Sequence, residues 1–149
     1  MNIDYDFETI ISNSHWINWC PDWVILESVY NKFPDSYSIL TPFAYAYLEE
    51  LIRTTTSDYG IELYDKLGNP RWRRTGNELI KLAIKENSDL EYLVLLDKVK
   101  AYFSTSMSTD SGDNRSSVIH GYMHPRFWSK ESFEDLIHII SLLSKFARF

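Results

Sequence analysis

Two residues in a short polar segment of the sequence, Arg115 and His120, are of types that together can cleave RNA. Histidine titrates near neutral pH and can accept or donate a proton, and a guanidinium offers paired N–H donors to charge that builds on phosphoryl oxygens. With these two groups a 2′-hydroxyl can attack the adjacent phosphate without a metal ion. Taken alone, residue type and spacing favour a simpler interpretation, in which Arg115 forms a structural ion pair and His120 is a partly buried helix residue.

The spacing of these two residues limits how they can cooperate. On a regular helix a separation of five residues turns two side chains about 140° apart, whereas Ser116 and His120 lie on one face. Arg115 therefore has to reach around from the start of the helix, and Asn114 or Ser116 could hydrogen-bond the histidine or a ligand. The arrangement is easier to build when two copies of the chain meet.

A second pair of histidines is a weaker candidate for chemistry. His120 and His124 are four residues apart and could ligate a metal from one helix face. Pro125 is expected to end that helix, and the residues between the histidines include no thiolate or carboxylate, so we expect neither a metal site nor a cofactor. We expect His124 and Arg126 instead to support the contact with RNA, within a local cluster of positive charge.

The segments that must position these residues have helical patterns. Apolar residues recur at helical spacing, and no segment shows the alternation that is typical of a strand. The sequence therefore predicts an all-α fold, a bundle of four or five helices, in a single domain over residues 1–149. Residues 1–36, which are rich in aromatic side chains, are expected to form a helical N-terminal extension that packs on the bundle.

Local signals indicate where the expected helices begin and end. Thr41 followed by Pro42 predicts one helix start, and Ser129 predicts the start of the final helix. Residues 104–113 are polar and predict a flexible loop directly before Arg115. The final helix carries a second apolar stripe, which favours contact with a partner. The other expected elements are two short helical pieces between Ile10 and Phe33, a loop from Leu67 to Gly76, a short helix ending near Asn87, and a long helix capped by Ser88 or Asp89.

The segment Asn114-Arg115, four further residues and His120-Gly121 resembles the Arg-x(4–6)-His motif of HEPN domains. The resemblance extends, more loosely, from about Tyr37 to the C-terminus. It implies a helical bundle that dimerises so that two motifs face each other across a cleft. In active members it implies a metal-independent endoribonuclease that leaves a 2′,3′-cyclic phosphate, with the histidine as general acid or base and the arginine as phosphate ligand.

The same resemblance implies a biological setting and additional residues. Members of this kind occur in toxin–antitoxin and phage-defence systems, so the expected partners are RNA as substrate, a second copy of the chain, and an antitoxin or nucleotidyltransferase. The Glu49–Glu50 pair could approach the cleft and orient Arg115 or Arg53. Family members often carry Asn, Asp or His directly after the arginine, where this chain has Ser116. HEPN domains also include non-catalytic members, so the alternative function is a dimerisation or interaction module.

Composition and charge restrict the remaining classes of function. The net charge of −6 disfavours a broad surface for phosphate backbones and gives no expectation of DNA specificity, so any RNA contact has to be local. Cys20 is the only cysteine, the first residues are acidic instead of forming a secretory signal, and no apolar run approaches the roughly 20 residues that cross a bilayer. We therefore expect a cytoplasmic protein without a membrane segment. A third hypothesis, a small-ligand pocket lined by the tryptophans, remains open at this point.

Overall fold

The computed structural model of the chain describes residues 2–62, 64–121 and 123–149, and most of them are helical. In chain order the elements are α1 (Ile3–Asn13), α2 (Cys20–Lys32), the 3-10 turn η1 (Pro34–Ser36), α3 (Tyr37–Arg53), α4 (Gly76–Glu86), α5 (Leu90–Val99), the 3-10 turn η2 (Lys100–Phe103), α6 (Arg115–Ile119), the 3-10 turn η3 (Pro125–Phe127) and α7 (Lys130–Ser144). Within the described ranges no strand forms, and the only β-type pairing there is an isolated bridge between Tyr64 and Pro70. The predicted all-α class is confirmed.

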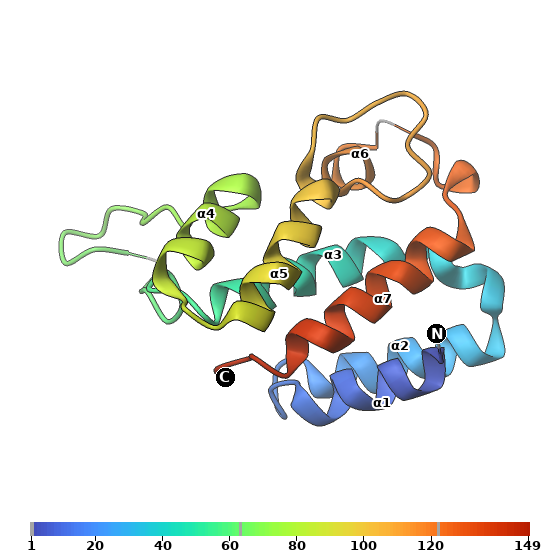
Figure 1. The fold of residues 1–149 in the computed structure, drawn as a ribbon, viewed down its shortest axis with the longest axis horizontal. Helices are drawn as coiled ribbons and strands as arrows, with labels where there is room; N and C mark the ends of the chain where they lie inside the picture. Colours follow the sequence, from blue (N-terminus) through green and yellow to red (C-terminus); the bar gives the residue numbers. More distant parts are fainter. Residues whose placement is uncertain (1, 63, 122) are drawn as a thin grey trace.

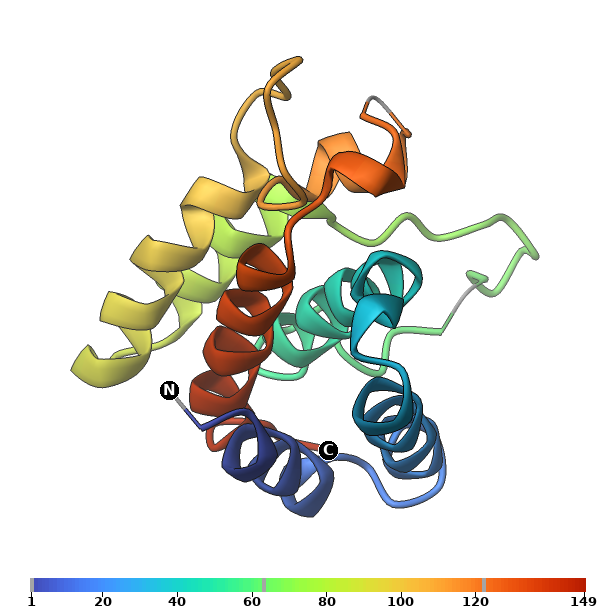
Figure 2. The same ribbon diagram turned by 90° about the vertical axis from the view of Figure 1, so that its right-hand side faces the viewer.

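Helix α7 crosses the middle of the molecule and joins its two sides (Figure 1). Helix α1, with α2 behind it, packs on one side of α7, and α3 and α5 flank the other, as the view turned by 90° shows (Figure 2). All seven α-helices contribute side chains to one apolar core, from Phe7 in α1 to Val118 in the short α6. The core therefore depends on segments that are far apart in the sequence.

The described chain forms seven α-helices: α1 and α2 lie in the expected N-terminal extension, and five helices, α3 to α7, follow it. The aromatic N-terminal segment makes two full helices, and the polar segment with Arg115 makes a separate short one. The second apolar stripe of α7 is covered within the chain: Ile139, Leu142 and Phe146 are partly buried against the core. The Phe146 ring packs on Tyr92 of α5 at 5.0 Å between centroids, so this stripe is no evidence for a partner.

The helix start predicted at Thr41 and Pro42 is also wrong. Helix α3 begins at Tyr37 and continues through the proline, directly after η1. Pro42 has no N–H to donate to the carbonyl four residues earlier, which removes one hydrogen bond of the helix. The Thr41 hydroxyl does not cap the helix but donates back to the Tyr37 carbonyl at 2.8 Å.

Helices α5 and α7 begin where the sequence predicted, after Asp89 and Ser129. Asp89 caps α5 by accepting the Tyr92 amide at 3.0 Å. Ser129 caps α7 by accepting the Ser132 amide at the same distance. Each cap satisfies a backbone donor that has no partner inside its helix. These local signals worked because the capping bonds span only three residues.

The polar loop before α6 is fastened to the core at its C-terminal end. The buried Tyr45 phenol donates to the Gly112 carbonyl at 2.9 Å, and the Ser129 amide donates to the Ser111 carbonyl at 2.6 Å. Burial raises the pKa of the Tyr45 phenol above its ordinary value, so it remains a donor. Gly112 has a φ of 96°, and a Cβ added there would lie 3.0 Å from Cβ of Trp128. This half of the loop therefore has a fixed path that determines where α6 begins.

We predict that Gly112→Ala lowers the free energy of unfolding by about 2 to 5 kcal/mol. Left-handed backbone costs a non-glycine residue roughly 1–2 kcal/mol, and overpacking against Trp128 adds roughly 1–3 kcal/mol. Gly60→Ala is the matched control, because Gly60 has a φ of 71° and nothing within 4 Å of an added Cβ. Urea unfolding of both variants measures the difference. Equal losses would contradict the close approach of Trp128.

Candidate functional site

Asn114 caps the start of α6 and holds it against the end of η2. Its Oδ1 accepts the Ser117 amide at 3.0 Å, and its Nδ2 donates to the carbonyl and hydroxyl oxygens of Ser104 at 3.0 and 3.1 Å. The residue is buried, so water does not compete for these bonds. Asn114 therefore positions the helix. The sequence suggested that its side chain could hydrogen-bond His120, but the side chain binds Ser104 and the Ser117 amide instead.

Arg115, the first residue of α6, is bound to Glu49 of α3. Its Nε lies 3.1 Å from Oε1 of the glutamate, and its Nη2 donates to Oε2 at 3.3 Å. Glu49 is 8% exposed, so the carboxylate is largely withdrawn from water. This two-point contact uses Nε and Nη2 and fixes the plane of the guanidinium. Glu49 therefore orients Arg115, the arrangement that the sequence suggested.

The same carboxylate binds the start of α4. Oε1 of Glu49 accepts the Gly76 amide at 3.0 Å. This amide is one of the backbone donors at a helix start that have no acceptor inside the helix. Thr75 stands at the N-cap of α4 but makes no side-chain capping bond, so Glu49 supplies an acceptor. One buried carboxylate thus joins α3, α4 and α6.

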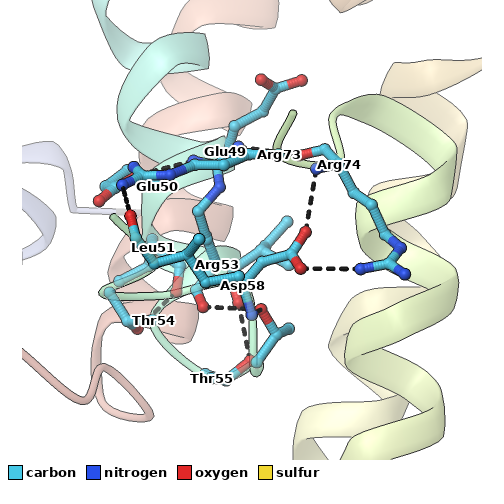
Figure 3. A network of polar contacts seen from close by, with 12 residues as sticks. Glu49, Glu50, Leu51, Arg53, Thr54, Thr55, Asp58, Arg73 and Arg74 are labelled. Carbon is cyan, nitrogen blue, oxygen red and sulfur yellow. Dashed lines mark hydrogen bonds and ion pairs between the residues drawn. The ribbon is translucent and has the colours of Figure 1, made fainter. Parts of the chain in front are cut away.

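One turn farther along α3, Arg53 organises a second set of buried polar contacts (Figure 3). Its Nη1 pairs with Oε2 of Glu50 at 2.6 Å, and its Nη2 donates to the Arg74 carbonyl at 3.0 Å. Arg74 in turn donates its amide and its Nη1 to the two carboxylate oxygens of Asp58, at 2.9 and 2.7 Å. These bonds hold the segment before α4 against the end of α3.

His120 follows the last residue of α6 and is exposed. Its amide donates to the Ser116 carbonyl at 3.0 Å, which closes the helix. Arg115 and His120, both within the described ranges, form no hydrogen bond with each other and lie at opposite ends of α6. At ~1.5 Å of rise per residue, about 7 Å of helix separates them. The expectation that Arg115 reaches around toward His120 is wrong, because Glu49 holds the guanidinium against α3.

The second histidine of the segment belongs to a different element. Nδ1 of His124 accepts the Arg126 amide at 3.2 Å and so caps η3, which requires the proton of the neutral ring to be on Nε2. Because α6 ends at Ile119, His120 and His124 do not share a helix face. In the described part of the chain no group of three or more His, Cys, Asp or Glu side chains could hold a metal ion.

Exposed apolar side chains lie on the elements around His120. Met107 is in the loop before α6, Ile119 ends α6, and Phe127 ends η3, and all three are exposed. Figure 1 shows α6, this loop and η3 together at one end of the molecule. Arg126 is exposed on the same turn as Phe127. This end therefore combines apolar surface with a histidine and an arginine.

The tryptophans do not gather around a common pocket. Trp23 is fully buried and packs on Phe43 and Tyr47, with ring centroids 5.3 and 5.0 Å apart. Trp16 and Trp72 lie on the surface in separate connecting segments. The buried tryptophans thus fill the core, and the exposed Trp16 and Trp72 lie in different connections, which removes the basis for a pocket lined by the tryptophans.

Comparisons with models of protein families, with curated proteins and with solved structures found no match to this chain. None of the helices in the described ranges combines the length and apolar character needed to cross a membrane.

Three residues that hold the site were absent from the sequence expectations. Tyr45, Gly76 and Ser104 act through bonds to backbone or to Asn114 and Glu49. The only advance signal was at Gly76, where Thr75 and the following apolar spacing are typical of a helix start. The acceptor for that start lies 27 residues earlier, which no local pattern reveals.

We predict that Glu49→Gln lowers the free energy of unfolding by about 1 to 3 kcal/mol, because Arg115 is then left partly buried without an anion. Glu78→Gln is the control, since Glu78 and Lys81 form an ion pair of 2.7 Å with both side chains about 70% exposed. An exposed pair of this kind contributes little to stability because water and salt screen it. Thermal unfolding at low and high salt measures both. A loss at Glu49 no larger than the loss at Glu78 would sink the structural role of the buried pair.

Proposed function

We propose that this protein is a metal-independent endoribonuclease of the HEPN type that acts as a homodimer. The observation that carries the proposal is the two-point contact of Glu49 with Arg115. It orients a guanidinium for a phosphate on the same short helix that exposes His120.

In the proposed reaction His120 accepts the proton of a 2′-hydroxyl as this oxygen attacks the adjacent phosphorus. The bond from phosphorus to the 5′ oxygen breaks, and His120 of the second copy donates a proton to that leaving oxygen. Arg115 stabilises the charge on the non-bridging oxygens. The products are a 2′,3′-cyclic phosphate and a 5′-hydroxyl, so no outside reactant is needed.

Two copies are required because one chain holds Arg115 against α3 while His120 lies at the far end of α6. The exposed side chains of Met107, Ile119 and Phe127 around α6 support self-association at this end of the molecule. Dimerisation here brings two copies of the Arg115 and His120 pair close to one RNA strand.

The neighbouring residues have supporting roles in the proposal. Asn114 positions α6. Ser116 is four residues before His120 and so lies on the same side of the helix. His124 and Arg126, exposed on η3, contact the RNA backbone beside the cleavage position. The biological setting of this activity is a toxin–antitoxin or phage-defence system, with an antitoxin or nucleotidyltransferase as the controlling partner.

We expect the wild-type protein to cleave mixed cellular RNA in the presence of EDTA and to leave 2′,3′-cyclic phosphate ends. Arg115→Ala and His120→Ala should each lower the rate at least about 100-fold, the usual contribution of general acid–base or charge-stabilising groups. His15→Asn is the matched control, because the His15 ring accepts the amides of Ile17 and Asn18 in a turn away from α6. Intact RNA with a verified dimer would instead support the non-catalytic interaction module.

The cleavage rate should fall as the pH is lowered from neutral, because a protonated imidazole cannot accept a proton from the 2′-hydroxyl. Single-turnover rates between pH 5 and pH 8 measure this dependence. Circular dichroism over the same range is the control for unfolding. A flat profile would rule out His120 as the base.

A further inference from the structure

The connection between α3 and α4 contains an arm, residues 64–74, that projects away from the helices (Figures 1 and 2). Tyr64 and Pro70 are bridged across the arm. At its tip the Asp65 carboxylate accepts the amides of Leu67 and Asn69 at 2.8 and 2.9 Å. Hydrogen bonds from the backbone and side chain of Asn69 hold the pKa of Asp65 below its usual range. The bridge and these bonds give the arm a hairpin-like turn.

The base of the arm is continuous with the candidate site. Nη2 of Arg73 donates to the Ile61 carbonyl at 2.6 Å, which ties the two sides of the connection together. Arg74 is held by Asp58 and by Arg53, and the Gly76 amide two residues later binds the Glu49 carboxylate that orients Arg115. The base of the arm is therefore bonded to the C-terminal part of α3, where Glu49 holds Arg115.

The arm exposes a large aromatic ring among positive charges. Trp72 is 93% exposed, the highest value among the exposed large apolar side chains of the described chain, and Tyr64 is 57% exposed. Residues 64–75 include four of the 15 Lys and Arg residues and one acidic residue, although the whole chain carries a charge of −6. The basic residues are Lys66, Arg71, Arg73 and Arg74. Aromatic rings interleaved with cations are typical of surfaces that bind single-stranded nucleic acid.

We propose that the arm binds single-stranded RNA, with the Trp72 ring stacked on a base and the exposed Lys66 and Arg71 side chains against phosphates. The choice of RNA as the ligand rests on the proposed function. The arm would bind the RNA strand that is cleaved at α6, at a position away from that helix. A base offers its π-face whatever its identity, so this contact is tolerant of sequence. Because the whole chain has a net charge of −6, phosphate contacts are expected only at local excesses of positive charge, of which the arm is one.

The test uses the full chain and a fluorescein-labelled single-stranded 2′-O-methyl RNA, which cannot be cleaved because its 2′ oxygen is blocked. Fluorescence anisotropy gives the Kd. Trp72→Ala should weaken binding at least about fivefold, the effect expected from loss of one stacked base, and Trp72→Phe should retain most of the affinity. Trp16→Ala is the matched control, since Trp16 is 75% exposed in another connection and should leave the Kd unchanged. Leu67→Ala, at the tip of the arm, should also change it little.

Three outcomes would overturn the proposal. In the first, Trp72→Ala binds the RNA as tightly as wild type. In the second, the Trp72→Ala variant is monomeric by light scattering, which would make the arm a contact between copies. In the third, wild type binds anionic lipid vesicles through Trp72 but does not bind RNA. Because the probe cannot be cleaved, its binding is independent of the nuclease reaction. Normal stacking at Trp72 with no RNA cleavage would remove the proposed function alone, and cleavage with no effect of Trp72 on binding would remove the arm alone.

Discussion

The geometry of the candidate site depends on a single carboxylate, that of Glu49. It receives two donors from Arg115 and one from the Gly76 amide, so three helices meet at one buried negative charge. A carboxylate in such a place is stable only while its donors are present, and each donor would be costly to leave unpaired. The positions of α3, α4 and α6 are therefore coupled: none of them can shift without breaking a charged contact of the others.

Helix α6 illustrates why this coupling is needed. It is five residues long, far below the roughly 12 to 15 residues at which an isolated helix becomes marginally stable in water. Its stability has to come from contacts outside the helix, which include the burial of Val118 in the core, the Asn114 bond to Ser104, and the Glu49 pair. A short helix held in this way presents its side chains in a defined direction, which binding or catalysis requires.

The sequence predicted the parts of the structure that local chemistry determines. The all-α class, the caps at Asp89 and Ser129, and the loop before α6 follow from periodicity and from residues that act within a turn of the helix. The path of α3 through Pro42 could not be predicted in the same way, because tertiary packing outweighs the loss of one hydrogen bond there.

The candidate site was predictable only in its residue types. Arg115 and His120 stand out because an arginine and a histidine with complementary chemistry share a short polar segment. Their actual relation depends on Glu49, which is 66 residues away from Arg115 and turns the guanidinium to α3. Spacing on an ideal helix describes directions at the backbone, whereas a long side chain follows the nearest buried charge.

The pairing of α1 with α7 has a consequence for the synthesis of the chain. Asp6 contacts His138, and Asn13 donates to Ser144, across 132 and 131 residues of sequence. Helix α7 also packs on α1, α3 and α5, so the apolar surface that these earlier helices bury against it stays uncovered until α7 has left the ribosome. Contacts between residues this distant in sequence slow folding, because a long loop must close before they form. A ribosome that stalls before Lys130 would therefore leave an open, aggregation-prone chain for chaperones and proteases to handle.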